Sequence, residues 1–79
     1  MRVRFRTISQ IENFVKIAKQ YKSKITVTDT AETYTADGKS YSELKILGTG
    51  KIVNVNFEDK KSSDFVMFES QIEALGIVR

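Results

Sequence analysis

Cysteine and histidine are both absent from the sequence, and the two absences exclude several kinds of chemistry. Without cysteine, the chain can form neither a disulfide framework nor a thiolate metal site. Without cysteine and histidine, it can assemble neither a Ser/His/Asp triad nor a Cys/His pair. No segment has metal-ligand spacing with usable ligand types. We therefore expect a protein that is not an enzyme and that carries no metal and no cofactor.

A long apolar run is absent as well. The N-terminal segment RVRFRTI alternates between basic and apolar residues, so it is neither a secretion signal nor a membrane span. We expect a cytoplasmic protein that makes no use of a membrane. A chain of 79 residues forms one domain, residues 1–79, with a small core. We expect it to be a monomer or a weak homodimer.

The net charge of +3 conceals an asymmetry along the chain. Residues 1–24 contain seven basic residues and one acidic residue, which gives +6; the other 55 residues contain six basic and nine acidic residues, which gives −3. A basic N-terminal segment could attract nucleic acid or an acidic protein surface. The same residues are also what the outward faces of a half-buried strand and a half-buried helix require.

An amphipathic helix followed directly by a strand dominates the first half of the chain. A helix is predicted over Gln10–Lys22, beginning at a capping box formed by Ser9 and Glu12. Its apolar residues recur at three- and four-residue steps: Ile11, Phe14, Val15, Ile17, Ala18 and Tyr21. Alternating apolar and polar residues predict strands over Arg2–Thr7 and Lys24–Thr28, on either side of this helix.

The second half of the chain predicts four further elements. A weak strand is expected over Glu32–Ala36, and a short helix between Ser40, which forms a capping box with Glu43, and Gly48. The segment KIVNVNF predicts a strand with Val53, Val55 and Phe57 inward. A last helix begins at Ser62 or Ser63, ends at Gly76, and carries an apolar stripe: Phe65, Phe68, Ile72 and Leu75.

The resulting order is β-α-β-β-α-β-α, in which every strand has one apolar face. This pattern predicts an α+β fold, an antiparallel sheet with all helices on one side and water on the other. A ferredoxin-like split βαβ arrangement gives a similar string of elements.

Three segments resemble the histidine-containing phosphocarrier (HPr) family of the bacterial sugar phosphotransferase system: FVKIAKQYKSKITVT, KSYSELKILG and KIVNVNF. The order of elements agrees, and the likeness covers nearly everything from Phe14 onward. The resemblance implies an HPr-like two-layer open-faced sandwich. Its four-stranded antiparallel sheet would have the order 1-4-2-3, with three helices on one face.

The resemblance fails where the chemistry of that family takes place. Family members carry phosphate on a histidine in a loop between the first strand and the first helix. This chain has no histidine, and its first strand runs into the helix several residues sooner. Thr7, Ile8 and Ser9 cannot substitute, because an alkyl hydroxyl lacks the near-neutral pKa and the nucleophilicity of imidazole. The usual phosphocarrier activity is therefore excluded, and the catabolite-repression paralogue of the family also lacks the histidine.

Lys39-Ser40 matches a second site of the family. In many Gram-positive members a regulatory kinase phosphorylates a serine that follows a lysine at the start of the second helix, so the resemblance implies Ser40 as a regulatory site. Family members surround that serine with apolar residues, whereas here only Tyr41 is apolar in the first turn. The alternative is that Ser40 is a helix N-cap and nothing more.

The function that we expect is that of a non-catalytic module that binds or regulates another protein. By resemblance, its contact surface combines the outer edge of the first long helix with the short helix, and the candidates are Lys16, Tyr41, Lys45 and Thr49. The alternative is a nucleic-acid-binding domain that uses the open sheet face. The residues expected there are Arg4, Arg6, Thr26, Thr28, Asn54 and Asn56. That face would supply charge and hydrogen bonds, but it lacks the aromatic platforms on which single-stranded nucleic acids stack.

Overall fold

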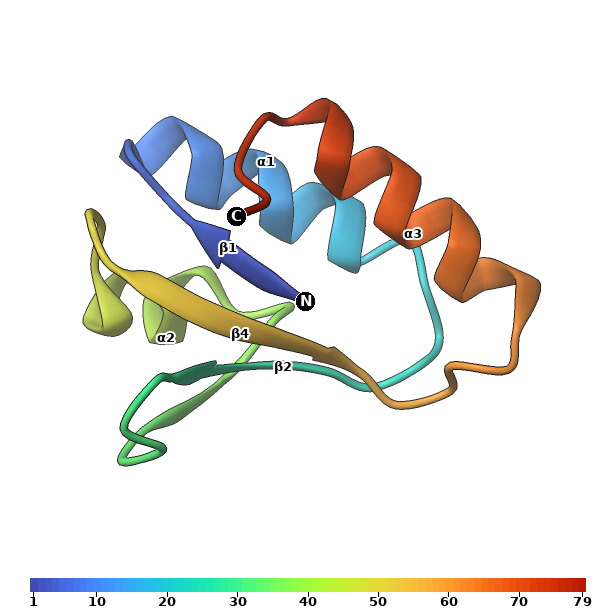
Figure 1. The fold of residues 1–79 in the computed structure, drawn as a ribbon, viewed down its shortest axis with the longest axis horizontal. Helices are drawn as coiled ribbons and strands as arrows, with labels where there is room; N and C mark the ends of the chain where they lie inside the picture. Colours follow the sequence, from blue (N-terminus) through green and yellow to red (C-terminus); the bar gives the residue numbers. More distant parts are fainter.

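The computed structural model describes residues 1–79 and contains four strands and three helices. Their bounds are β1 (Arg2–Arg4), α1 (Ile8–Ala18), β2 (Ile25–Asp29), β3 (Thr35–Asp37), α2 (Tyr41–Leu47), β4 (Ile52–Phe57) and α3 (Ser63–Ala74). The strands form one antiparallel sheet in the order β1-β4-β2-β3, with all three helices on one face (Figure 1). The predicted α+β topology is therefore confirmed.

The core lies between the sheet and the helices. It contains 18 buried residues, all of them apolar or aromatic, and no polar or charged residue is buried with them. Phe14 on α1, Phe57 on β4 and Phe68 on α3 are each at most 1% exposed. Because alternate residues of each strand point into this core, the opposite face of the sheet is left to polar side chains.

The first helix differs from its prediction at both ends. It begins at Ile8 rather than Gln10, because Thr7 is the N-cap and accepts a hydrogen bond from the Gln10 amide at 3.2 Å. The Gln10 side chain in turn accepts from the Arg6 amide at 2.7 Å. These reciprocal bonds replace the predicted pairing of Ser9 with Glu12. The helix ends at Ala18. A turn follows, in which the Tyr21 amide donates to the Ala18 carbonyl, and the Tyr21 side chain lies in the core, only 7% exposed.

Strand β1 is shorter than predicted and ends at Arg4 rather than Thr7. Its outer edge is covered by the C-terminal segment: the Arg4 amide donates to the Ile77 carbonyl, and the Arg79 amide donates to the Arg2 carbonyl, both at 2.8 Å. Ile77 is fully buried beneath the end of α3. The partly buried Val78 packs against the same core.

The hairpin between β2 and β3 also differs from its prediction. Strand β3 covers Thr35–Asp37 rather than Glu32–Ala36, because the residues before it form the loop. The Asp29 carboxylate holds that loop, accepting from the Thr33 amide at 2.8 Å and from the Tyr34 amide at 3.1 Å. Ala36 is therefore the inward residue of β3 and is fully buried.

The later elements follow their predictions closely. Ser40 caps α2 by accepting from the Glu43 amide at 3.3 Å, although Glu43 bonds the Asp37 amide at 3.0 Å instead of returning to Ser40. Both Leu44 and Leu47 are buried, and α3 begins after its N-cap Ser62. None of the helices combines the length and the apolar character needed to cross a membrane.

Candidate functional site

The outer edges of α1 and α2 form one continuous surface, which we call the α1–α2 surface. A shallow depression of about 220 Å³ lies there, lined by Glu12, Val15, Lys16 and Lys19 of α1 and by Tyr41 of α2. The Lys45 ammonium lies 5.4 Å from the centroid of the Tyr41 ring, within the range of a cation–π contact. Three of the four residues predicted for a partner surface, Lys16, Tyr41 and Lys45, are thus brought together.

The packing of α2 explains which of its side chains face water. Leu44 and Leu47 are buried against the core, so the residues between them turn outward. Ile46 is 71% exposed, more than any other large apolar residue of the chain. The prediction omitted Ile46, although its position two residues after Leu44 places it roughly 200° around the helix from the inward stripe. That spacing was the available signal.

A junction of two loops extends this surface beyond α2. The Gly50 amide donates to the Phe5 carbonyl at 2.7 Å, so the loop that follows α2 lies against the loop that precedes α1. Ile8, the first residue of α1, is 42% exposed next to this junction. Thr49, the fourth predicted residue, is exposed in the same loop, but it does not line the depression.

Ser40 stands at the edge of the α1–α2 surface as a partly exposed residue. Its hydroxyl accepts from the Glu43 amide and lies 3.3 Å from the Ser42 hydroxyl. These contacts are those of an N-cap. The regulatory role implied by the resemblance stays a prediction.

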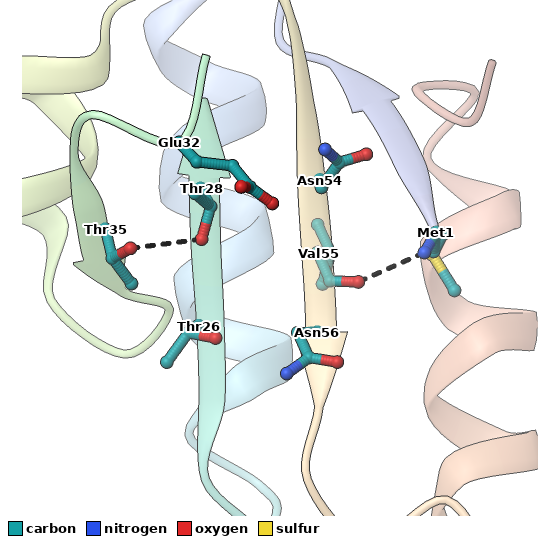
Figure 2. Close-up of a pocket in the computed structure, with 8 residues that line it drawn as sticks. All are labelled: Met1, Thr26, Thr28, Glu32, Thr35, Asn54, Val55 and Asn56. Carbon is teal, nitrogen blue, oxygen red and sulfur yellow. Dashed lines mark hydrogen bonds between the residues drawn. The ribbon is translucent and has the colours of Figure 1, made fainter. Parts of the chain in front are cut away.

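The open face of the sheet carries a second depression, of about 510 Å³. Its lining consists of small polar residues from the three strands β2, β3 and β4, with three others beside them: Met1, Thr26, Thr28, Glu32, Thr35, Asn54, Val55 and Asn56 (Figure 2). The predicted Asn54 and Asn56 lie in it. Arg4 and Arg6 do not: Arg4 pairs with Ile52 at the β1 edge, and Arg6 lies beyond the end of β1.

Glu32 provides the one charged side chain in the lining of that depression. It occupies the hairpin loop with a φ of 58°, the left-handed region that L-residues other than asparagine and aspartate rarely adopt. In Figure 2 its side chain extends from the loop across β2 toward β4. Nothing in the sequence around Glu32 predicted this backbone conformation, because glutamate has no preference for it.

Hydrogen bonds within the same loop also change the pKa of Asp29. The Thr33 hydroxyl and then the Tyr34 amide, both donating to the Asp29 carboxylate, lower the pKa of Asp29 below its ordinary value of 3.8. The ionised form of Asp29 is therefore part of what holds the loop that carries Glu32. No cluster of three or more acidic residues is placed to hold a metal ion.

No protein-family model matches the chain, and no curated protein matches it. Membership of the phosphocarrier family therefore stays a prediction that depends on the three segments quoted above. The sheet order that the resemblance implied is the one observed.

Proposed function

We propose that the protein is a non-catalytic, HPr-like module that binds another protein through the α1–α2 surface. One observation carries the proposal: Ile46 stands 71% exposed on α2, next in sequence to Lys45, on the helix whose Tyr41 joins the lysines of α1 in the depression. Aromatic side chains such as Tyr41 are enriched in protein contact surfaces, and Ile46 adds exposed apolar area on the same helix. In this proposal the module acts in the cytoplasm, as a monomer or a weak homodimer.

The charge of the surface suggests the kind of partner. Lys16, Lys19 and Lys45 are all exposed, whereas Glu12 is the one acidic residue in the depression. Such a patch would attract an acidic protein surface and speed association, while Tyr41 and Ile46 would supply apolar area to the contact. We therefore infer an acidic partner with an apolar centre.

Nucleic-acid binding on the open sheet face has less support. The depression there is lined by threonines, asparagines and one carboxylate, and no aromatic side chain is among them. A carboxylate repels the phosphate backbone, and single-stranded nucleic acids need aromatic platforms for stacking. Arg4 and Arg6, which were expected to supply the positive charge, lie outside this lining.

Affinity capture with matched variants tests the proposal. The immobilised protein should enrich a discrete set of acidic proteins from nuclease-treated lysate of its source cells. The double variant Lys45→Glu/Ile46→Ser should lose that enrichment, because it changes only exposed residues of the contact. The control Lys60→Glu/Lys61→Glu changes two exposed lysines before α3 and should retain it. Equal enrichment by all three proteins, or none by the wild type, would refute the proposal.

A further inference from the structure

The hairpin loop holds Glu32 in a strained backbone conformation, with a φ of 58°. A left-handed conformation at a residue other than glycine is a backbone cost, and such residues concentrate where a side chain must be held in one place. Glycine or asparagine at this position would relieve the cost. What glutamate adds is a carboxylate at the rim of the depression on the open sheet face, on the opposite side of the sheet from the helices (Figure 2).

The floor of the depression is set by the register of the sheet. Asn54 pairs with Thr28, and Thr28 pairs with Thr35; two residues along the strands, Asn56 pairs with Thr26. The Thr28 and Thr35 hydroxyl oxygens lie 3.2 Å apart. Hydroxyls and amides can each donate and accept, so the floor presents a grid of neutral groups that suits a ligand with several hydroxyls.

From these two features we infer that the open sheet face binds a small polyhydroxylated amine, the chemical class of which amino sugars are the simplest members. The ammonium of the ligand would face Glu32, and its hydroxyls would bond Thr26, Thr28, Asn54 and Asn56. The depression, of about 510 Å³, is open to solvent and lined mainly by polar groups, so a ligand there would stay partly exposed. The inference is independent of the proposed function, which uses the helical side of the molecule.

Other charged groups lie at the margins of the proposed site. Lys24 and Asp37 line an adjoining depression, which shares Thr26 and Thr35 with it. The Met1 nitrogen also lines the depression, but it lies at the opposite side of β4 from Glu32 and donates to the Val55 carbonyl at 3.1 Å (Figure 2). An ammonium placed beside Glu32 is therefore not displaced by a basic side chain of the lining. Because no aromatic ring contributes stacking, we expect weak binding, with a dissociation constant on the order of 1 mM.

Titration of the isotope-labelled protein with glucosamine, followed by amide chemical shifts, tests the inference. Shifts should concentrate at Thr26, Thr28, Asn54 and Asn56. Neutral glucose should bind more weakly, by up to about fivefold, the scale of a solvent-exposed ion pair. Glu32→Gln should weaken glucosamine binding by the same factor and remove the preference over glucose. The control Glu73→Gln, an equal charge change at an exposed residue of α3, should leave binding as in the wild type.

The variant Glu32→Gly distinguishes the backbone strain at Glu32 from the contribution of its carboxylate to ligand binding. Glu32→Gly should fold more stably than the wild type and still lose the preference for glucosamine, because it removes the carboxylate together with the strain. The inference is overturned if glucosamine causes no shifts, if the shifts fall on the helices, or if wild type and Glu32→Gln bind glucosamine equally. It is equally overturned if glucose binds the wild type as tightly as glucosamine does.

Discussion

Truncation of Phe14 should remove a large part of the stability of this domain. Phe14 is fully buried, and its ring makes edge-to-face contacts with Phe5 at 5.3 Å and with Phe68 at 6.1 Å between centroids. Phe14→Ala thus loses apolar burial, leaves a cavity and breaks two aromatic pairs, for which we expect a loss of about 4 kcal/mol. A domain of 79 residues has a total free energy of unfolding of only about 4–12 kcal/mol.

Urea unfolding followed by far-ultraviolet circular dichroism measures this loss, since the chain has no tryptophan to report it. Phe14→Ala could be unfolded in water, so Phe14→Leu, with an expected loss of about 1 kcal/mol, keeps the measurement possible. Ile46→Ala is the matched control: it truncates a side chain that is 71% exposed and should change stability by less than about 0.5 kcal/mol. A loss below about 1 kcal/mol for Phe14→Ala would show that the packing of α1 on the sheet is misplaced.

Four further predictions concern single positions. Ser40→Ala should lose about 1 kcal/mol of unfolding free energy, while Ser40→Asp should be nearly neutral, because aspartate also caps a helix; equal losses would contradict the cap. Gly38→Ala should destabilise by about 1–3 kcal/mol, since its Cβ would lie 2.7 Å from Ile25 Cγ2 and 3.0 Å from the Ile25 carbonyl oxygen; an unchanged melting temperature would contradict this. Glu32→Gly should stabilise by about 1 kcal/mol in thermal or urea unfolding, by relieving the left-handed conformation, and destabilisation would contradict the strain. Because the pKa of Asp29 is lowered on folding, the advantage of wild type over Asp29→Asn should be complete above pH 3.8 and disappear as the pH falls below it; an advantage that persists under acid would show that ionisation is not its source.

The order of elements followed from the sequence because apolar periodicity is a direct consequence of burial on one face. Val53, Val55 and Phe57 alternate in β4, and all three are buried as that alternation predicts. The ends of the helices and strands were harder to predict from the sequence, since they depend on single hydrogen bonds. Ser9 and Thr7 can both cap a helix, and the choice of Thr7 came from a Gln10 side chain that reaches the Arg6 amide.

The β2–β3 hairpin is a second place where local hydrogen bonds, which the sequence does not reveal, set the bounds of a strand. The high strand propensity of Thr33, Tyr34 and Thr35 favoured an earlier β3, but three groups that donate to the Asp29 carboxylate hold two of these residues in the loop. Such a local side-chain bond competes with the sheet ladder and is not visible in propensity. The conformation of Glu32 follows from that loop, so it could not be predicted before the loop was known.

The short connection between β1 and α1 bears on the extent of the proposed contact surface. Only Phe5, Arg6 and Thr7 separate the two elements, and Thr7 already satisfies an amide of the first helical turn. The first helical residue is Ile8, an exposed apolar side chain, where a longer loop would leave amides free for an anion. Because the Gly50–Phe5 hydrogen bond places the loop after α2 against this connection, Ile8 adds apolar area next to the α1–α2 surface. The short connection therefore adds exposed apolar area beside the surface through which we propose that the chain binds another protein.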